Sequence, residues 1–481
     1  MPRPVTSAAS RVRERAARVP GAGRDALALA LLALALGLPG AVAAKNGAYR
    51  DAAHGRRDTG VVRLVGTARG ECIHCHGAPR DAAGQRPDGR GHTALFSGAN
   101  DLCLGCHERA AGSWLGAREY GDSGHGTSPS VIWPGPMPPA RSASDAGLCV
   151  NCHDPHGVKD AAGLVPSLLH LRPAALCLGC HAGSPGADVA SAFSRPYRHP
   201  LVADPAKTGA PADAAPGSAL AGGRSVAGGT CSGCHNPHAA AADPAARVAG
   251  EVARALAGAA RVRLANGTAG SAPTRVVAAR SDRMLVREYE VCFKCHSGTG
   301  RLTRSDLAAA LNPANPSFHP VEGRGRNVAI DRRSFAVGWS ADRLVTCSDC
   351  HASDDESTRG PHGSTFPHIL RRRHLADAGS SAPAQETDLC FECHGFATYA
   401  DPFPGPATAF SRYAGHATHA SKGVSCWACH DAHGSATLPA LLTLRAPGLA
   451  RLEPEAGGGT CTVTCHLATG SRVTYRVAYP R

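Results

Sequence analysis

All 20 cysteines of the chain fall into ten pairs, and a histidine follows the second cysteine of every pair. Nine pairs have the five-residue form CxxCH, and the tenth, CTVTCH, has one more residue. Residue frequencies alone predict about 0.04 chance matches to the five-residue form. The paired cysteines are Cys72 and Cys75, Cys103 and Cys106, Cys149 and Cys152, Cys177 and Cys180, Cys231 and Cys234, Cys292 and Cys295, Cys347 and Cys350, Cys390 and Cys393, Cys426 and Cys429, and Cys461 and Cys465. The histidines that follow them are His76, His107, His153, His181, His235, His296, His351, His394, His430 and His466.

This spacing is the one that covalent haem attachment requires. A c-type site bonds the two vinyl groups of haem as thioethers, while the adjacent histidine ligates the iron. In a helical turn, cysteines at i and i+3 project within about 60° of each other, and those at i and i+4 within about 40°. Both spacings therefore suit the chemistry, and we expect ten covalently attached haem c groups.

Three other kinds of cysteine site explain the motifs less well. Structural zinc needs four ligands from two knuckles and does not require a histidine directly after each second cysteine. A disulfide framework suits an exported chain, but it leaves the ten histidines unexplained. A redox CxxC of the thioredoxin type occurs once or twice in a fold. A local disulfide remains the main alternative at CTVTCH.

The other axial ligand of each iron must come from elsewhere in the chain. Methionine is scarce, since only Met137 and Met284 follow the initiator, whereas 14 histidines lie outside the motifs. The motifs form five successive pairs, which begin at Cys72, Cys149, Cys231, Cys347 and Cys426, and each pair has two accessory histidines. One predicted sixth ligand precedes each motif pair, and these are His54, His125, His199, His319 and either His416 or His419, of which we take His419. The other predicted sixth ligand lies between the two motifs of each pair, and these are His92, His156, His238, His362 and His433. Histidine on both faces leaves the iron no open position for a substrate.

Some accessory histidines follow a motif histidine by only three residues, as His156 follows His153. Three residues span at most about 10 Å, which is too short to pass around the macrocycle to the far side of the same iron. We therefore expect His156 to bind a neighbouring haem, namely the one at Cys177 in the same pair. The alternative is that His156 only hydrogen-bonds a propionate.

Four further histidines are not needed as ligands. We expect His74, which lies inside its motif, to be exposed. We expect His170, His368 and His374 to lie at the surface or against propionates.

The N-terminal residues predict export. Residues 1–25 contain six arginines, residues 26–38 are nearly all Ala and Leu, and Ala41-Val42-Ala43 offers small residues for cleavage. This apolar run of about 13 residues is shorter than the roughly 20 of a spanning helix. We expect a signal peptide, location in the periplasm or at the cell surface, and a soluble mature chain. No lipid anchor is expected, because the first cysteine is Cys72.

The positive charge does not indicate nucleic acid. The formal net charge of +13 falls to +9 without residues 1–44, which carry six arginines and two acidic residues. Ten haems would add about −20 from propionates and about +10 from ferric cores. The arginine excess is then a source of partners for propionates.

The composition predicts a fold with little protein core. Only 5% of the residues are aromatic, while Gly (56) and Pro (36) are abundant. We expect a mostly irregular, haem-packed fold with short α-helices and minor β-structure, built from five two-haem repeats. The predicted domains are a signal peptide (1–44), a four-haem region (45–195) and a six-haem region (196–481). A helix is expected near residues 245–260, and a hairpin around Asn266-Gly267.

The segments CVNCHDPHG from Cys149, CSGCHNPHA from Cys231 and CWACHDAHG from Cys426 resemble those of bacterial multihaem c-type cytochromes with doubled CxxCH motifs. The resemblance covers nearly all of the chain after residue 44. It implies a decahaem electron carrier, not an enzyme, of the kind found in organisms that respire metals and other external acceptors. Partners would be redox proteins, an outer-membrane conduit or mineral acceptors. The first pair lacks the PHG element, and the fourth has it later.

The alternative function is a multihaem reductase that acts on nitrite, hydroxylamine or tetrathionate. Such an enzyme needs one five-coordinate haem, which the nitrite group often marks with lysine in place of the motif histidine. Every motif here ends in histidine, and Lys294 lies inside CFKCH. Self-association into a filament is compatible with electron transfer.

The first prediction concerns the number of haems. The mass of the mature protein should exceed that of its polypeptide by ten haems, which should stay attached after denaturation because thioether bonds hold them. Mass spectrometry of the denatured protein measures this. A count of nine would single out the CTVTCH site, and fewer than eight haems, or stoichiometric zinc, would contradict the assignment.

Overall fold

The computed structural model describes residues 48–76, 100–107, 117–132, 146–200, 230–241, 254–276, 287–298, 306–327, 330, 332–374, 382–401, 414–444, 449–455, 458–464 and 473–478. By its contacts the chain divides into Met1–Gly47, which lies outside the described residues, and Ala48–Arg481. The predicted signal peptide, the predicted ligand His92, and Cys465 and His466 of the tenth motif therefore lie outside the described residues.

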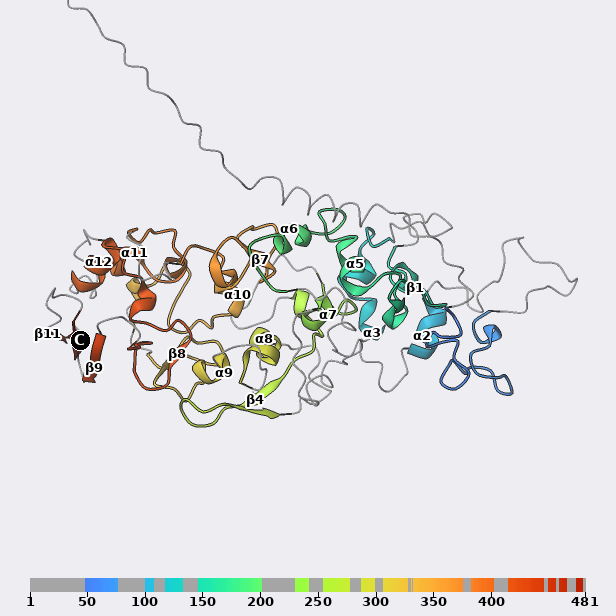
Figure 1. Ribbon diagram of the computed structural model, residues 1–481, viewed down its shortest axis with the longest axis horizontal. Coiled ribbons are helices and arrows are strands. Elements are labelled where there is room, and N and C mark those ends of the chain that lie inside the picture. Colours follow the sequence, from blue (N-terminus) through green and yellow to red (C-terminus); the bar gives the residue numbers. More distant parts are fainter. Residues whose placement is uncertain are drawn as a thin grey trace, which may run out of the picture. The chain divides into compact units, whose positions relative to one another are not determined.

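Short helical segments separated by irregular chain make up most of the described residues (Figure 1). The α-helices are α2 (Asp101–His107), α3 (Ala117–Tyr120), α4 (Gly124–Thr127), α5 (Pro173–Leu178), α6 (Val189–Phe193), α7 (Cys231–Cys234), α8 (Glu288–His296), α9 (Leu307–Ala310), α10 (Cys347–Cys350), α11 (Phe396–Tyr399) and α12 (Ala414–Ser421). The 3₁₀ turns are η2 (Cys72–His74), η4 (Cys149–Asn151), η5 (Pro166–Leu168), η7 (Arg254–Leu256), η9 (Arg332–Ser334), η10 (Pro367–Ile369), η11 (Leu389–Glu392) and η13 (Cys426–Ala428). Among the described residues, no helix has the length and apolar character needed to cross a membrane.

The strands are short and antiparallel. They are β1 (Lys159–Asp160), β2 (Gly163–Leu164), β3 (Tyr197–Arg198), β4 (Arg263–Ala265), β5 (Thr274–Val276), β6 (Ser317–Phe318), β7 (Gly363–Ser364), β8 (Gly434–Ser435), β9 (Leu449–Glu455), β10 (Gly458–Val463) and β11 (Val473–Ala478). Four two-stranded sheets pair β1 with β2, β3 with β7, β4 with β5 and β6 with β8, and a three-stranded sheet has the order β11-β10-β9. The β4–β5 pair confirms the predicted hairpin around Asn266-Gly267.

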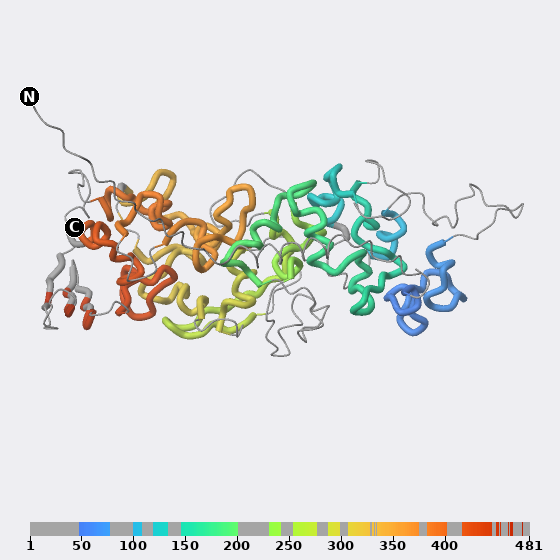
Figure 2. The backbone as a smooth tube through the Cα atoms, turned by 45° about the horizontal axis from the view of Figure 1, so that its top comes forward, coloured from blue at the N-terminus to red at the C-terminus, as the bar shows by residue number. Residues whose placement is uncertain are grey.

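The mostly irregular fold with short helices confirms the predicted class, and the tube in Figure 2 shows how much of the chain runs in turns and loops. Of the helix expected near residues 245–260, the described part contains only the short turn η7. The largest described hydrophobic cluster has four buried members, Val262, Phe293, Ala308 and Leu311. Many other buried apolar side chains are alanines, as the low aromatic content predicts.

Two of the small sheets connect histidines from distant parts of the chain. Strand β3 ends directly before His199, and β7 begins directly after His362. The amide of His199 donates to the carbonyl of His362 at 3.3 Å. Strands β6 and β8 repeat the arrangement, with the amide of His319 donating to the carbonyl of His433 at 3.1 Å.

Glycine permits these close approaches. A Cβ atom on Gly363 would lie 1.9 Å from the carbonyl oxygen of Ala192, and one on Gly434 would lie 2.0 Å from that of Ala310. Both distances are far below van der Waals contact, so only glycine fits beside the neighbouring backbone. The glycine after each of these histidines is therefore a packing requirement.

The predicted boundary after residue 195 is not visible as a break in packing among the described residues, which all belong to Ala48–Arg481. The amide of Gly124 donates to the carbonyl of Ala240 at 2.8 Å across this boundary. The hydroxyl of Thr358 donates to the carbonyl of Asp188 at 3.0 Å.

Candidate haem sites

The described CxxCH motifs are helical, and those at Cys103 and Cys292 form the ends of the longer helices α2 and α8. In most of them the amide of the motif histidine donates to the carbonyl of the first cysteine, which closes the turn and brings both thiols to one side. This bond measures 2.8 to 3.0 Å for His76, His153, His181, His235, His351, His394 and His430. The turn geometry expected from the cysteine spacing is therefore present in these motifs.

Each of the nine described motif histidines faces an imidazole from outside its motif. The ring centroids of the two partners lie 5.9 to 6.4 Å apart. The pairs are His76 with His156, His107 with His54, His153 with His238, His181 with His125, His235 with His362, His296 with His199, His351 with His433, His394 with His319 and His430 with His416.

This separation fits one metal between two imidazoles. An imidazole nitrogen lies about 1.2 Å from its ring centroid and about 2 Å from a metal that it ligates, so two rings on opposite sides of one metal have centroids about 6.4 Å apart. The residues present therefore fit a haem iron with histidine on both faces.

His156 lies elsewhere than the sequence predicts. Its ring faces His76 in the motif at Cys72, whereas the ring that faces His181, at the predicted partner Cys177, is His125. The same displacement recurs, because His238, His362 and His433 each face the first motif of the preceding pair. The chain-length argument concerns only the haem of the histidine's own motif, so it does not reveal that these ring contacts run backwards between pairs.

In the last motif pair, the ring that faces the first motif histidine comes from helix α12. The ring opposite His430 is His416, with centroids 6.4 Å apart. The predicted set contains His419 at this place, so the structure favours the other member of the two histidines left open by the sequence.

Two histidines that were not predicted as ligands, His74 and His170, are buried. The ring of His74 is completely inaccessible, and its Nδ1 accepts from the amides of Arg63 and Leu64 at 3.2 and 3.1 Å. His170 is 6% exposed, and its Nε2 lies 2.7 Å from the carbonyl of Val150. The predicted exposure of His74 was wrong, and so was a surface position for His170, because backbone hydrogen bonds hold both rings inside the fold. The alternative that His170 lies against a propionate stays a prediction.

A repeated turn orients the motif histidines, and sequence reasoning missed it. The carbonyls of Ser167, His368 and Ala440 lie 2.8 to 2.9 Å from the Nδ1 atoms of motif histidines His153, His351 and His430, respectively. Each carbonyl belongs to a residue with φ between 54° and 61°, and the next residue is also left-handed. Such backbone is unfavourable for a side chain as large as leucine or isoleucine. The recurring letters PSLL, PHIL and PALL were the available signal.

Burial favours the ligating form of the histidines. It lowers the pKa of His153, His351 and His394 to about 4. Nearby histidines add to this effect. These rings are therefore neutral at physiological pH, which is the state that donates a nitrogen lone pair to a metal.

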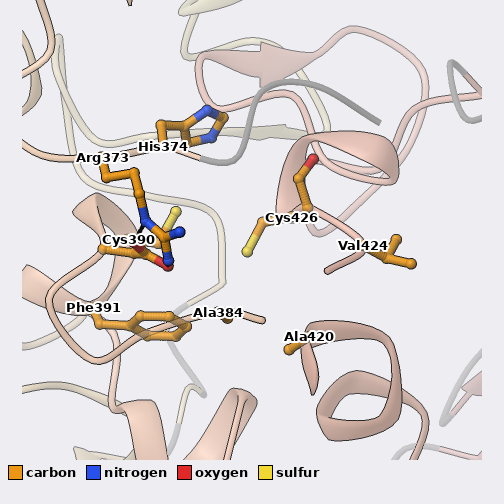
Figure 3. Close-up of a pocket in the computed structure, with 10 residues that line it drawn as sticks. Arg373, His374, Ala384, Cys390, Phe391, Ala420, Val424 and Cys426 are labelled. Carbon is orange, nitrogen blue, oxygen red and sulfur yellow. Dashed lines mark hydrogen bonds and ion pairs between the residues drawn. The ribbon is translucent and has the colours of Figure 1, made fainter. Parts of the chain in front are cut away.

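Cysteines of successive motif pairs contact each other, the first cysteine of the second motif in one pair with the first cysteine of the next pair. Their side chains hydrogen-bond each other in four places, which are Cys103 with Cys149, Cys177 with Cys231, Cys292 with Cys347 and Cys390 with Cys426. Figure 3 shows Cys390 and Cys426 directed toward one another in a pocket that Phe391 and Val424 also line.

Within a pair, the second cysteines of the two motifs lie near each other. Burial raises the pKa of Cys75, and the nearby Cys106 adds to this shift. The same two causes act on Cys152 through Cys180, on Cys295 through Cys234, and on Cys350 through Cys393. In each of these four pairs the two second cysteines are therefore close enough to influence each other's pKa.

The tenth motif differs from the others. Cys461 lies in strand β10, opposite Leu452 of β9 and Tyr475 of β11, and not in a helical turn. The predicted turn geometry was therefore wrong for this cysteine. The remainder of CTVTCH, from Cys465, lies outside the described residues.

Two stretches, residues 141–185 and 341–398, match the family model described as the doubled CXXCH motif. The chain carries the doubled CXXCH motif. These stretches contain the motif pairs that begin at Cys149 and Cys347, and the match implies a multihaem c-type cytochrome with covalently attached haem c. The chain matches no curated protein and no solved structure.

One buried lysine lies between two of the motifs. The Lys294 ammonium, inside CFKCH, donates to the carbonyl of Gly233 inside CSGCH. Burial lowers the pKa of Lys294. A positive charge beside a haem favours the reduced state, because reduction adds negative charge.

The second prediction follows from this placement. The substitution Lys294→Met should lower the reduction potential of a haem at Cys231 or Cys292 by roughly 50 to 100 mV. Spectroelectrochemical titration of the whole protein measures it, with Lys294→Arg as the control that keeps a charge. Identical titration curves for the Met variant and the unmodified protein would refute the electrostatic role.

Proposed function

We propose that the protein is an exported decahaem c-type cytochrome that transfers electrons along a series of haems with histidine on both faces. It passes electrons to or from redox proteins, an outer-membrane conduit or extracellular acceptors such as metal oxides. Haem supplies the one-electron chemistry when it is bound. The residues of the chain attach the haems, orient their axial ligands and keep successive groups close.

The observation that carries this proposal is the set of nine facing histidine pairs, with ring centroids 5.9 to 6.4 Å apart. An iron held between two imidazoles has all six positions filled, so it exchanges electrons without binding a substrate. A reductase needs one iron with a single protein ligand. The facing rings at the nine described motifs favour the carrier.

The cysteine contacts support a path in the order of the sequence. The attachment cysteines mark the vinyl edges of the porphyrins. Edges that meet at Cys103 and Cys149, or at Cys390 and Cys426, bring successive haems close together. We infer that electrons move in either direction along the haems from Cys72 to Cys426 in motif order, with entry and exit near the two ends of the series.

Export is supported by the chemistry and by the N-terminal residues. Covalent haem attachment and the Arg-rich, Ala/Leu-rich segment 1–44 both point to a protein that crosses the inner membrane of a bacterium. The periplasm or the cell surface is the proposed location. Partners are proposed to dock near the terminal haems of the series.

The third prediction tests ligation by counting open irons. His156→Ala and His125→Ala should each produce one high-spin haem per protein, and the double variant should produce two, because the two rings face His76 and His181. Electron paramagnetic resonance (EPR) of the oxidised proteins and carbon monoxide binding to the reduced proteins give the counts. The unmodified protein should be entirely low-spin.

Other numbers of high-spin haems would contradict this assignment of ligands. One open haem in the double variant would mean that only one of the two histidines is an axial ligand. Unchanged low-spin spectra would remove His156 and His125 from the ligands. A high-spin fraction in the unmodified protein that responds to nitrite or hydroxylamine would favour the reductase.

A further inference from the structure

Four short turns contain the histidines that face backwards to the preceding motif pair. These bridging turns are Asp154-Pro155-His156, Asn236-Pro237-His238, Gly360-Pro361-His362 and Asp431-Ala432-His433. In three of them the amide of the histidine donates to the Oδ1 atom two residues earlier, at 3.0 Å. This is the Asx turn that Asp and Asn favour. The turn at His362 has Gly360 at the first position, with φ of 90°, and there the amide of His362 donates to the backbone carbonyl of Gly360 at 2.9 Å.

The middle residue of every bridging turn contacts a second histidine. Its carbonyl lies within hydrogen-bond distance of an Nδ1 atom, in the pairs Pro155 with His54, Pro237 with His125, Pro361 with His199 and Ala432 with His319. The first three distances are 3.2, 2.9 and 2.6 Å. These four histidines face His107, His181, His296 and His394, the second motif histidines of the preceding pairs.

We propose that each bridging turn is a positioning element for both haems of the preceding motif pair. Its histidine faces the first motif of that pair, and the carbonyl just before it holds the ring that faces the second motif. The inference rests on the proposed histidine ligation, which it extends by naming the residues that set the ligand orientation. Two irons thus share a single three-residue support.

The carbonyl contact acts through chemistry that is general for metal-bound histidine. Donation from Nδ1 to a backbone carbonyl fixes the tautomer, leaves Nε2 as the ligating atom and sets the rotation of the ring. The proline ring is not required, since Ala432 makes the same contact to His319. The essential feature is the position of the carbonyl.

The two haems supported by one turn differ in the angle between their ligand rings. Facing rings at the first motifs make angles of 5° to 39°. Those at the second motifs make angles of 49° to 89°. In a low-spin ferric haem, near-parallel imidazoles give a rhombic EPR signal, and crossed imidazoles give a signal with a larger maximum g value. The unmodified protein should therefore show both signals.

The fourth prediction uses the glycine beside one bridging turn. In Gly434→Ala the new Cβ would lie 2.0 Å from the carbonyl oxygen of Ala310, so β8 must move away from the end of α9. That movement displaces His433 and the carbonyl of Ala432 together. One near-parallel and one crossed signal should therefore change at once, those of the pairs His351–His433 (5°) and His394–His319 (49°).

The matched control is Gly323→Ala, because a Cβ on Gly323 meets nothing within 4 Å. This variant should leave both EPR signals unchanged. A change in Gly434→Ala that is confined to one class of signal, or no change, would overturn the shared support.

A second pair of variants tests the turn if Gly434→Ala fails to assemble. Asp431→Ala removes the acceptor of the His433 amide, whereas Asp431→Asn keeps an Oδ1 acceptor, as Asn236 does in its own turn. Asp431→Ala should alter the signals of both haems, and Asp431→Asn should leave the crossed signal as it was. An effect of Asp431→Ala on the near-parallel signal alone would overturn the inference. A wild-type protein without low-spin signals would instead refute the proposed function.

Discussion

Two imidazoles that share one metal must face each other across a fixed gap, and this requirement organises the chain. The two members of a facing pair come from separate segments, as His235 and His362 do, or His153 and His238. Each such pair therefore closes a long loop at the cost of chain entropy. Helical turns, small sheets and glycine contacts serve to bring the two rings opposite each other.

The protein part of the fold is correspondingly sparse. The largest described hydrophobic cluster has only four buried members, and the strand pairs β3–β7 and β6–β8 are two residues long. Elements of this size have little stability by themselves. Bound haems would add apolar surface and covalent links between segments, so attachment and folding should be strongly coupled.

Local chemistry was readable from the sequence, whereas contacts between distant segments were not. The CxxCH spacing predicts helical turns, and these form at seven motifs through the bond from the histidine amide to the first cysteine. The Asn266-Gly267 hairpin was also predictable, because turn residues act locally. The partner of His156 depends on a contact with the segment around His54, which no local pattern encodes. The buried ring of His74 and the left-handed turn at Ser167 similarly depend on hydrogen bonds that form only after the chain has folded.

The facing histidine pairs are the central claim, and near-infrared magnetic circular dichroism of the oxidised whole protein tests them most directly. Its charge-transfer bands distinguish iron with two histidines from iron with histidine and methionine, and from high-spin iron. The account predicts that the bis-histidine band carries the intensity of all the haems. A methionine band, or a high-spin band equal to one haem or more, would contradict it.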